Sequence, residues 1–504
     1  MKANNLRLGL ILSYVSIIIH SLINIAYTPI VLSYLGANEY GLYSLSMSIT
    51  GYLNILRFGF ANSYLRYYSK YKVEEDNKKI AELNGLYLLV FSVIGLLSFI
   101  IGLVIVASVS SLFREGLTID EVSKAKVLIF IIVINVSISF PLNIVQYFLT
   151  ANEKFVFIRA LGLIEGVISP CMAVCALALG FGSVGMTVIA LIVTVVLKVI
   201  QIYYCVKKCS YKLTIKIKNF EMLKEIFIFS SYVFLNTIAD QLSLNVDKFI
   251  LGRYRGTADV AIFGIAMQIQ TIYYAIANNI TSVVSPRVNR LVLSKNKEGI
   301  DDLFIKVGRL QFIILSLIMS GFILIGRQFM FLWVGDEFAD SFTIALLLML
   351  PATFYQVQLL SVDVQRAMNM HKFRSAALFV IAIVKTGISI PLAQSFGGIG
   401  CAIGTAITTI SGSIIIMSIY NQRKVGLCIT QLYKNVAFFI PALIVPAVFG
   451  ILINRYIDLH TITSFLLFGF LYVIVFAGSM WVISLNKYEK NLIIEPIKRI
   501  IKNH

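Results

Sequence analysis

Ionisable side chains inside long apolar stretches are the residues of this sequence that are best placed to do chemistry. His20, Asp240 and Lys385 fall near the middle of their stretches. Arg57 and Glu165 fall nearer to one end of theirs. Holding such groups in an apolar environment is costly, so each one is a candidate functional group. An arginine or a lysine there can hold an anion, and a carboxylate or an imidazole can exchange a proton.

Each candidate also has a structural interpretation. Asp240 and Lys385 could form an ion pair, and His20 could pack as a hydrogen bonder between helices instead of carrying a proton. Two further lysines, Lys198 and Lys248, are expected to extend their ammonium groups to a membrane interface, because a long aliphatic stem permits it. Sequence alone leaves these alternatives open.

The composition places these residues in a membrane protein. The chain has 504 residues, of which 58% are hydrophobic and 13% charged, and its mean hydropathy is +0.86. A soluble core cannot contain that much apolar surface, whereas lipid can. The first apolar stretch is longer than the core of a signal peptide and ends without a cleavage pattern, so we expect it to be a membrane span.

Fourteen apolar stretches approach the twenty residues that cross a bilayer as a helix. Strands are excluded, because open sheet edges cannot face lipid and the stretches are too long for barrel strands. The sequence therefore predicts an all-α polytopic protein with fourteen transmembrane helices. The predicted spans are 8–32, 40–64, 86–109, 126–149, 157–180, 184–205, 227–250, 259–284, 309–333, 341–365, 375–396, 399–420, 435–454 and 462–484.

The distribution of positive charge predicts the orientation. With the N-terminus in the cytoplasm, 32 of the 43 lysines and arginines lie in inner segments and seven in outer ones. This bias predicts that both termini are cytoplasmic. The net charge of +18 then faces anionic lipid rather than nucleic acid. Asp363 and Arg366 are expected to pair at the inner end of the tenth span, because residues three apart are neighbours on a helix.

The sequence repeats itself. GANEYGLY at Gly36–Tyr43 aligns with GTADVAIF at Gly256–Phe263, and the turn GSVG at 182–185 aligns with GGIG at 397–400. Each copy contains six predicted helices, an even number, so the two bundles should be related by a pseudo-two-fold axis along the membrane normal. Two extra C-terminal helices have no repeat partner. The predicted domains are an N-terminal lobe at 1–224, a C-terminal lobe at 225–430, and helices 13 and 14 with a tail at 431–504.

The sequence has no cofactor motif in the structural context that cofactor binding requires. Gly180–Gly185 fits the GxGxxG spelling, but it follows a membrane helix rather than a strand and recurs as a turn in the second copy. The sequence contains neither GxxxxGK[ST] nor HExxH, and its four histidines are scattered. We therefore predict no cofactor and no metal. The longest outer connection, about 110–125, is too short for a catalytic domain.

Several motifs resemble one family of membrane proteins. LGANEYGLYSL, RFGFANSYLRYYSKY, NVDKFILGRYRGTADVAIFGIAMQI, VVSPRVNRL and FLWVGDEF, in this order, resemble bacterial polysaccharide flippases. These belong to the polysaccharide transporter branch of the multidrug/oligosaccharidyl-lipid/polysaccharide exporter superfamily. The resemblance covers about residues 8–484. The residues within its motifs include Arg66, Asp247, Lys248, Pro286 and Arg287.

The resemblance implies a transporter rather than an enzyme. It implies two six-helix lobes that alternate access and flip oligosaccharide repeat units on an undecaprenyl-pyrophosphate carrier across the bacterial inner membrane, for O-antigen, capsule or exopolysaccharide. It also implies polymerase and chain-length proteins of the same pathway as partners. Within that frame, our own interpretation assigns substrate binding to Arg57, Lys385 and His20. We assign ion coupling to Asp240 and Glu165.

Arg57 is the favoured anchor for the pyrophosphate. If its span is a continuous helix that starts outside, the side chain leans away from the cytoplasmic interface and towards a cavity. The rival interpretation is a scaffold pair between Arg57 and Glu165.

Three other functions stay open. A multidrug exporter of the same superfamily would favour an acidic cavity for cationic substrates, against which Arg57 and Lys385 argue. A lipid II flippase is a second alternative. A membrane polysaccharide polymerase is the third, and it would need a larger outer loop than this chain has.

Overall fold

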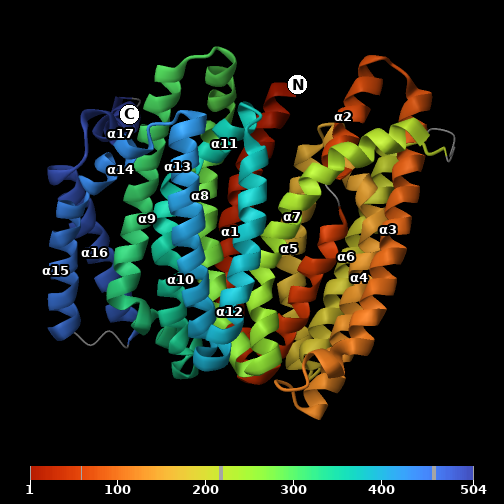
Figure 1. Cartoon of the computed structure of the whole chain (residues 1–504), viewed down its shortest axis with the longest axis horizontal. Helices are drawn as coiled ribbons and strands as arrows, with labels where there is room; N and C mark the ends of the chain where they lie inside the picture. The colour runs from red at the N-terminus through yellow and green to blue at the C-terminus, as the bar shows by residue number, and fades with distance from the viewer. Residues whose placement is uncertain (1, 58–59, 210, 215–219, 457–460, 503–504) are drawn as a thin grey trace. The chain divides into compact units, whose positions relative to one another are not determined.

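The computed structural model describes residues 2–57, 60–209, 211–214, 220–456 and 461–502, and over these residues every regular element is a helix (Figure 1). The elements up to the eighth long helix are α1 (Lys2–Asn54), η1 (Ile55–Arg57), α2 (Phe60–Val73), α3 (Asn77–Leu112), α4 (Ile119–Ala151), α5 (Phe155–Ala178), α6 (Gly182–Lys208), α7 (Phe220–Tyr254) and α8 (Thr257–Leu293). The remaining elements are α9 (Lys297–Val334), η2 (Asp336–Phe338), α10 (Asp340–Val357), α11 (Leu360–Ala367), α12 (His371–Thr408), η3 (Thr409–Ile416), α13 (Met417–Tyr420), η4 (Asn421–Val425), α14 (Ile429–Ala437), α15 (Ile440–Tyr456), α16 (Ile462–Ile483) and α17 (Lys487–Lys502).

Ten helical stretches in the described part of the chain are long and apolar enough to cross a membrane. The all-α membrane class is therefore confirmed, and the count of fourteen stays a prediction. Part of the difference has a clear cause. The stretch Lys372–Val425 holds both the eleventh and the twelfth predicted spans. α1, which contains the first predicted span and the beginning of the second, is not among the ten stretches.

Positive φ angles mark where these long helices are interrupted. Gly36 has φ 69° inside α1, and Gly397 has φ 58° inside α12. Past Gly397 the chain folds back on itself. A Cβ added to Gly400 would overlap the backbone carbonyl of Leu392, and one added to Gly404 would lie 2.9 Å from the Ser389 hydroxyl. Later residues thus face progressively earlier ones, which is the geometry of a helical hairpin.

The left-handed turns recur at matching places in the two halves of the sequence. Two pairs are 220 residues apart, and two pairs are 216 and 215 residues apart. The pairs are Gly36 with Gly256, Glu75 with Lys295, Glu153 with Asn369, and Gly182 with Gly397. The turn before α3 is also capped like the turn before α9, since Asp76 and Asn296 each accept a hydrogen bond from the backbone N–H three residues on. The left-handed turns of the backbone therefore recur at positions that match the sequence repeat.

The chain divides into two compact units, Met1–Gly264 and Ile265–His504. This division does not coincide with the predicted repeat boundary after residue 224. Its cause is α7, which begins the second sequence repeat but packs against α1, α2 and η1 of the first unit. Since the units reflect packing and the lobes reflect sequence repetition, the predicted lobes stay a prediction.

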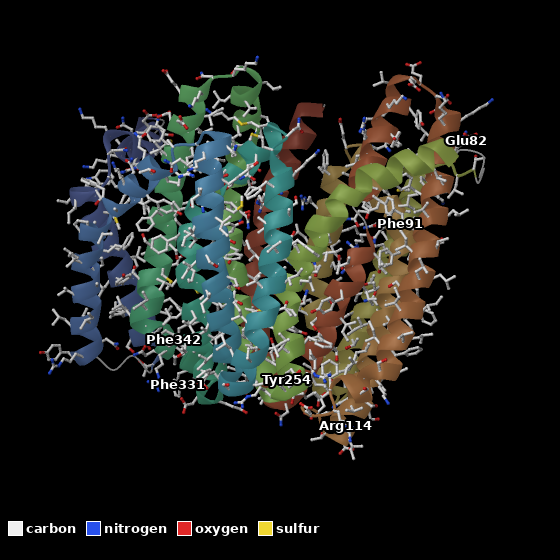
Figure 2. All side chains as sticks on the ribbon, viewed as in Figure 1. Glu82, Phe91, Arg114, Tyr254, Phe331 and Phe342 are labelled. Atoms are coloured by element: carbon white, nitrogen blue, oxygen red, sulfur yellow. The ribbon has the colours of Figure 1, made fainter. Side chains whose placement is uncertain are left out.

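In the first unit, small residues let helices approach closely. A Cβ at Gly95 of α3 would lie 2.7 Å from the Ser137 carbonyl oxygen of α4, so the two backbones are nearly in contact there. Apolar side chains such as Leu96 and Val104 point outwards, as expected where lipid is the solvent. Figure 2 shows Glu82 and Arg114 at opposite ends of this unit, with Phe91 between them.

In the second unit, one buried ion pair joins α9 to the C-terminal helix. Arg309 Nε donates to Glu489 Oε1 at 2.6 Å, and Arg309 Nη2 donates to Glu489 Oε2 at 2.9 Å. The two side chains are only 6% and 3% exposed. The guanidinium also donates to the Ser484 carbonyl and stacks over Phe439 at 4.5 Å.

Asp363 and Arg366 form the predicted local pair. Arg366 Nη1 lies 3.6 Å from Asp363 Oδ1 on α11, and the arginine side chain is 67% exposed. The prediction is confirmed, and an exposed pair of this kind contributes little to stability.

The Glu39 carboxylate links three helices at one end of the first unit. Glu39 follows the Gly36 turn, lies 2.6 Å from Lys124 of α4, and accepts the backbone N–H of Ser183 in α6 at 2.8 Å. Burial alone would raise the pKa of Glu39, but the hydrogen bonds from Lys124 and Ser183 outweigh it and hold the pKa below its usual value. Glu39 therefore ties three helices together while it is ionised.

Acid is expected to weaken these contacts of Glu39. Because the folded-state pKa of Glu39 is lowered, its contribution to stability is complete above about pH 4.3 and is lost as the pH falls through the folded-state pKa. The thermal midpoint of the wild type should thus fall more steeply than that of Glu39→Gln between about pH 6 and pH 3. Glu115→Gln, at an exposed carboxylate near the same end, should behave as wild type. Equal slopes for Glu39→Gln and the wild type would contradict the role of Glu39.

Candidate substrate-binding site

A lysine inside the first unit is held by three amide side chains. Lys198 of α6 donates to Asn143 Oδ1 at 2.9 Å, to Gln146 Oε1 at 3.0 Å and to Gln201 Oε1 at 3.5 Å. Asn143 and Gln146 are three residues apart on α4, as are Lys198 and Gln201 on α6, so each pair shares one helix face. The expectation that Lys198 reaches a membrane interface stays a prediction. Its ammonium points at α4.

Two of the predicted site residues surround this lysine. Lys198 interacts electrostatically with Glu165 of α5 and with Arg57 of η1. Arg57 also interacts with Tyr147 of α4. We call Arg57, Glu165, Lys198 and the amide side chains around Lys198 the polar cluster of the first unit. Two cations against one carboxylate give it a net positive charge, which suits an anionic ligand.

The guanidinium of Arg57 is available to a ligand. Arg57 is exposed and, within the part of the chain that the structure describes, makes no hydrogen bond or ion pair. In particular, no ion pair within 4.0 Å joins it to Glu165, so the scaffold pair is not formed in this structure. The helix around Arg57 differs from expectation. α1 ends at Asn54 and Arg57 closes a short 3-10 turn, so the argument from a continuous α-helix does not apply to it.

His20 lies next to the polar cluster. A Cβ added to Gly166 of α5 would overlap the His20 ring, so the imidazole packs directly on the α5 backbone beside Glu165. The ring is half-buried and makes no hydrogen bond within the described residues. Packing is thus observed, without the hydrogen bond that the packing interpretation included.

The charged residues of α7 anchor this helix to α1. Lys248 Nζ donates to Ser44 Oγ at 3.0 Å, and the expectation that Lys248 extends to an interface stays a prediction. Asp247 is 1% exposed and interacts electrostatically with Tyr52 of α1. Asp240, about two helical turns earlier on α7, is exposed. Asp247 and Lys248 are therefore packing residues.

The other predicted residues fall outside the polar cluster. Lys385 is 5% exposed and belongs to α12 in the second unit, so its predicted pairing with Asp240 of the first unit stays a prediction. Arg66 of α2 and Arg287 of α8 are exposed, and Pro286 lies inside α8.

Sequence reasoning missed the role of Lys198. A signal was present, because Asn143, Gln146 and Gln201 are amides at helical spacing in otherwise apolar spans. Amide side chains in membrane helices need hydrogen-bond partners. The need of these three amides for partners therefore indicates a cation between α4 and α6.

Comparisons with known proteins agree with this architecture. A family model described as "Polysaccharide biosynthesis protein" matches residues 6–292, more than half of the chain. A Shigella flexneri protein described as "Putative O-antigen transporter" is 21% identical over 406 residues, which cover 77% of this chain and 91% of that protein.

Solved structures show the same fold. The lipid II flippase MurJ in an inward closed conformation has a TM-score of 0.76 at 17% identity, covering 96% of this chain and 99% of its own. An inward-facing multidrug resistance MATE transporter of the MOP superfamily has a TM-score of 0.64 at 17% identity, covering 82% of this chain and 96% of its own. The chain is thus a membrane protein with a MOP-like transporter fold, and it belongs to the polysaccharide biosynthesis protein family.

Proposed function

We propose that the chain flips undecaprenyl-pyrophosphate-linked oligosaccharide repeat units from the cytoplasmic to the outer leaflet of the bacterial inner membrane. It does so by alternating access of its two repeat lobes, with both termini in the cytoplasm. Family membership and the likeness to an O-antigen transporter support a polysaccharide-related flippase. The recurrent turns support the two lobes.

The polar cluster of the first unit is the observation that carries the choice of substrate. A pyrophosphate needs charge-assisted donors when it leaves water, and a guanidinium can hold two of its oxygens at once. Arg57 supplies such donors unpaired, and Lys198 adds a second positive charge that its amide partners hold in place. A site for cationic drugs would need the opposite sign of charge.

The remaining predicted residues complete the proposal. His20 and Lys385 would also contact the substrate, while Glu165 and Asp240 would change protonation or bind an ion as the lobes alternate. Both carboxylates are exposed, which supports access for a proton or a cation. A polymerase and a chain-length protein of the same pathway would receive the flipped product.

Deleting the gene tests this function. Lipid-linked repeat units should accumulate on the cytoplasmic leaflet, and surface polysaccharide should disappear, because the flipping step precedes polymerisation. The leaflet is read by the accessibility of the glycan to a lectin, in intact and in inverted vesicles. Unpolymerised units on the outer leaflet would instead indicate a polymerase. Accumulation of lipid II would indicate a lipid II flippase, and drug sensitivity with normal polysaccharide would indicate a multidrug exporter.

A further inference from the structure

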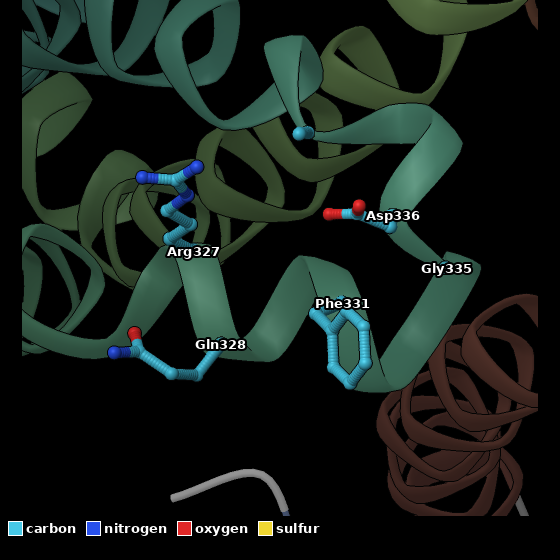
Figure 3. Close-up of a pocket in the computed structure, with 6 residues that line it drawn as sticks. Arg327, Gln328, Phe331, Gly335 and Asp336 are labelled. Atoms are coloured by element: carbon cyan, nitrogen blue, oxygen red, sulfur yellow. The ribbon is translucent and has the colours of Figure 1, made fainter.

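A pocket of about 400 Å³ opens at one end of the second unit, where α9 ends and η2 begins (Figure 3). Its size lies within the range of about 300–1,000 Å³ that is common for ligand pockets. By the predicted topology this end faces the outside of the cell. The pocket is lined by Arg327, Gln328, Phe331, Gly335, Asp336 and Ala339.

A donor group, Arg327, and an acceptor group, Asp336, both line this pocket. Figure 3 shows the Asp336 carboxylate directed towards the side where the Arg327 guanidinium lies. Within the described residues neither group makes a hydrogen bond or an ion pair of 4.0 Å or less. Together they present several N–H donors and two carboxylate oxygens with no net charge. Such a set can bind hydroxyl groups, which donate to Asp336 and accept from Arg327.

The other lining groups add a flat apolar surface and fixed geometry. Phe331 is 43% exposed, so part of its ring is accessible. Gln328 Nε2 donates to Asn454 Oδ1 at 3.0 Å, which leaves the Gln328 carbonyl oxygen free to face a ligand. Gly335 has φ 93°, a conformation that glycine adopts without strain, and this turn sets Asp336 against α9.

We propose that this pocket binds one sugar residue of a glycan. A pyranose ring has hydroxyl groups on its edge and C–H groups on its face, and the pocket offers charged hydrogen-bonding groups beside an exposed aromatic ring. The choice of a glycan rests on the proposed function, but the pocket uses residues of the second unit only. It would hold the head of the substrate at the end of transport, separately from the pyrophosphate.

Direct binding tests the proposal. We would present free hexoses and N-acetylhexosamines to the full chain in lipid nanodiscs, which avoids glycoside detergents, and record saturation-transfer NMR. We expect transfer to the C–H protons of at least one sugar. Asp336→Asn should weaken its binding about ten- to a hundred-fold, as expected for the loss of a charge-assisted hydrogen bond. Phe331→Leu should reduce the transfer to the C–H face.

Matched variants make the outcome decisive. Glu337→Gln changes the neighbouring exposed carboxylate outside the pocket and should bind as wild type. Binding of glycine in place of sugars would overturn the proposal in favour of a zwitterion site. Saturation transfer to a sugar that is unchanged in Asp336→Asn and Phe331→Leu would also overturn the proposal. The absence of transfer to every sugar would do the same. The binding assay does not depend on flipping. Failure of the sugar site and failure of the proposed flippase function would therefore give different results.

Discussion

Replacing Arg57 by alanine is expected to abolish most flipping while the protein still inserts in the membrane. Arg57 supplies unpaired donors in a net positive cluster, so its loss removes a charge-assisted contact to the pyrophosphate. Such a contact is worth roughly 1.5–3 kcal/mol, or about ten- to a hundred-fold in binding. Flipping is measured with fluorescent lipid-linked oligosaccharide in proteoliposomes, and insertion by the amount of folded protein in membranes.

Three variants bracket this expectation. Arg57→Lys should lie between the wild type and Arg57→Ala, because an ammonium keeps the charge but loses the bidentate fork. Arg159→Ala removes an exposed arginine from α5 and should flip normally. Glu165→Gln should leave substrate binding nearly unchanged, because no ion pair joins Glu165 to Arg57. Wild-type flipping by Arg57→Ala would move the anchor to Lys385 or elsewhere.

Local sequence patterns predicted the elements of this fold well. The apolar stretches became helices because lipid leaves the backbone no other partner than itself. The turns at Gly36, Gly256 and Gly182 lie where the aligned glycines placed them, since glycine adopts a positive φ without strain. The Asp363–Arg366 pair was also predictable, because one helix turn fixes its distance.

Contacts between helices were not predictable in the same way. The hydrogen-bond partners of Lys198 and Lys248 were not predicted, because Asn143 and Ser44 lie 55 and 204 residues away. Periodicity shows which face of a helix is polar, but it does not show which other helix that face meets. The end of α1 at Asn54, just before Arg57, was also not predictable, because no proline marks it in the sequence.

The buried pair of Arg309 and Glu489 is the clearest contact of this kind, since 180 residues separate its members. The sequence marks Glu489 only as one carboxylate in a basic tail. In the structure it also caps α17, where its carboxylate accepts the backbone N–H of Asn486 at 2.9 Å. One side chain thus joins the start of α17 to α9, and through α9 to the core that contains Phe304 and Phe439.

Replacing Glu489 by alanine is therefore expected to destabilise the second unit strongly. The change leaves the Arg309 guanidinium buried without its counter-charge, a situation that costs about 3–5 kcal/mol. The double variant Arg309→Met/Glu489→Met should recover most of this loss, because two apolar side chains need no partner. Asp302→Asn is the matched control. It breaks the exposed Asp302–Lys306 pair on the same helix, an i, i+4 contact of 2.7 Å that is worth about 0.3–0.5 kcal/mol. Thermal unfolding in one detergent ranks the variants. If Glu489→Ala unfolds no earlier than Asp302→Asn, or if the double variant is less stable than Glu489→Ala, the pair does not hold α17 in place.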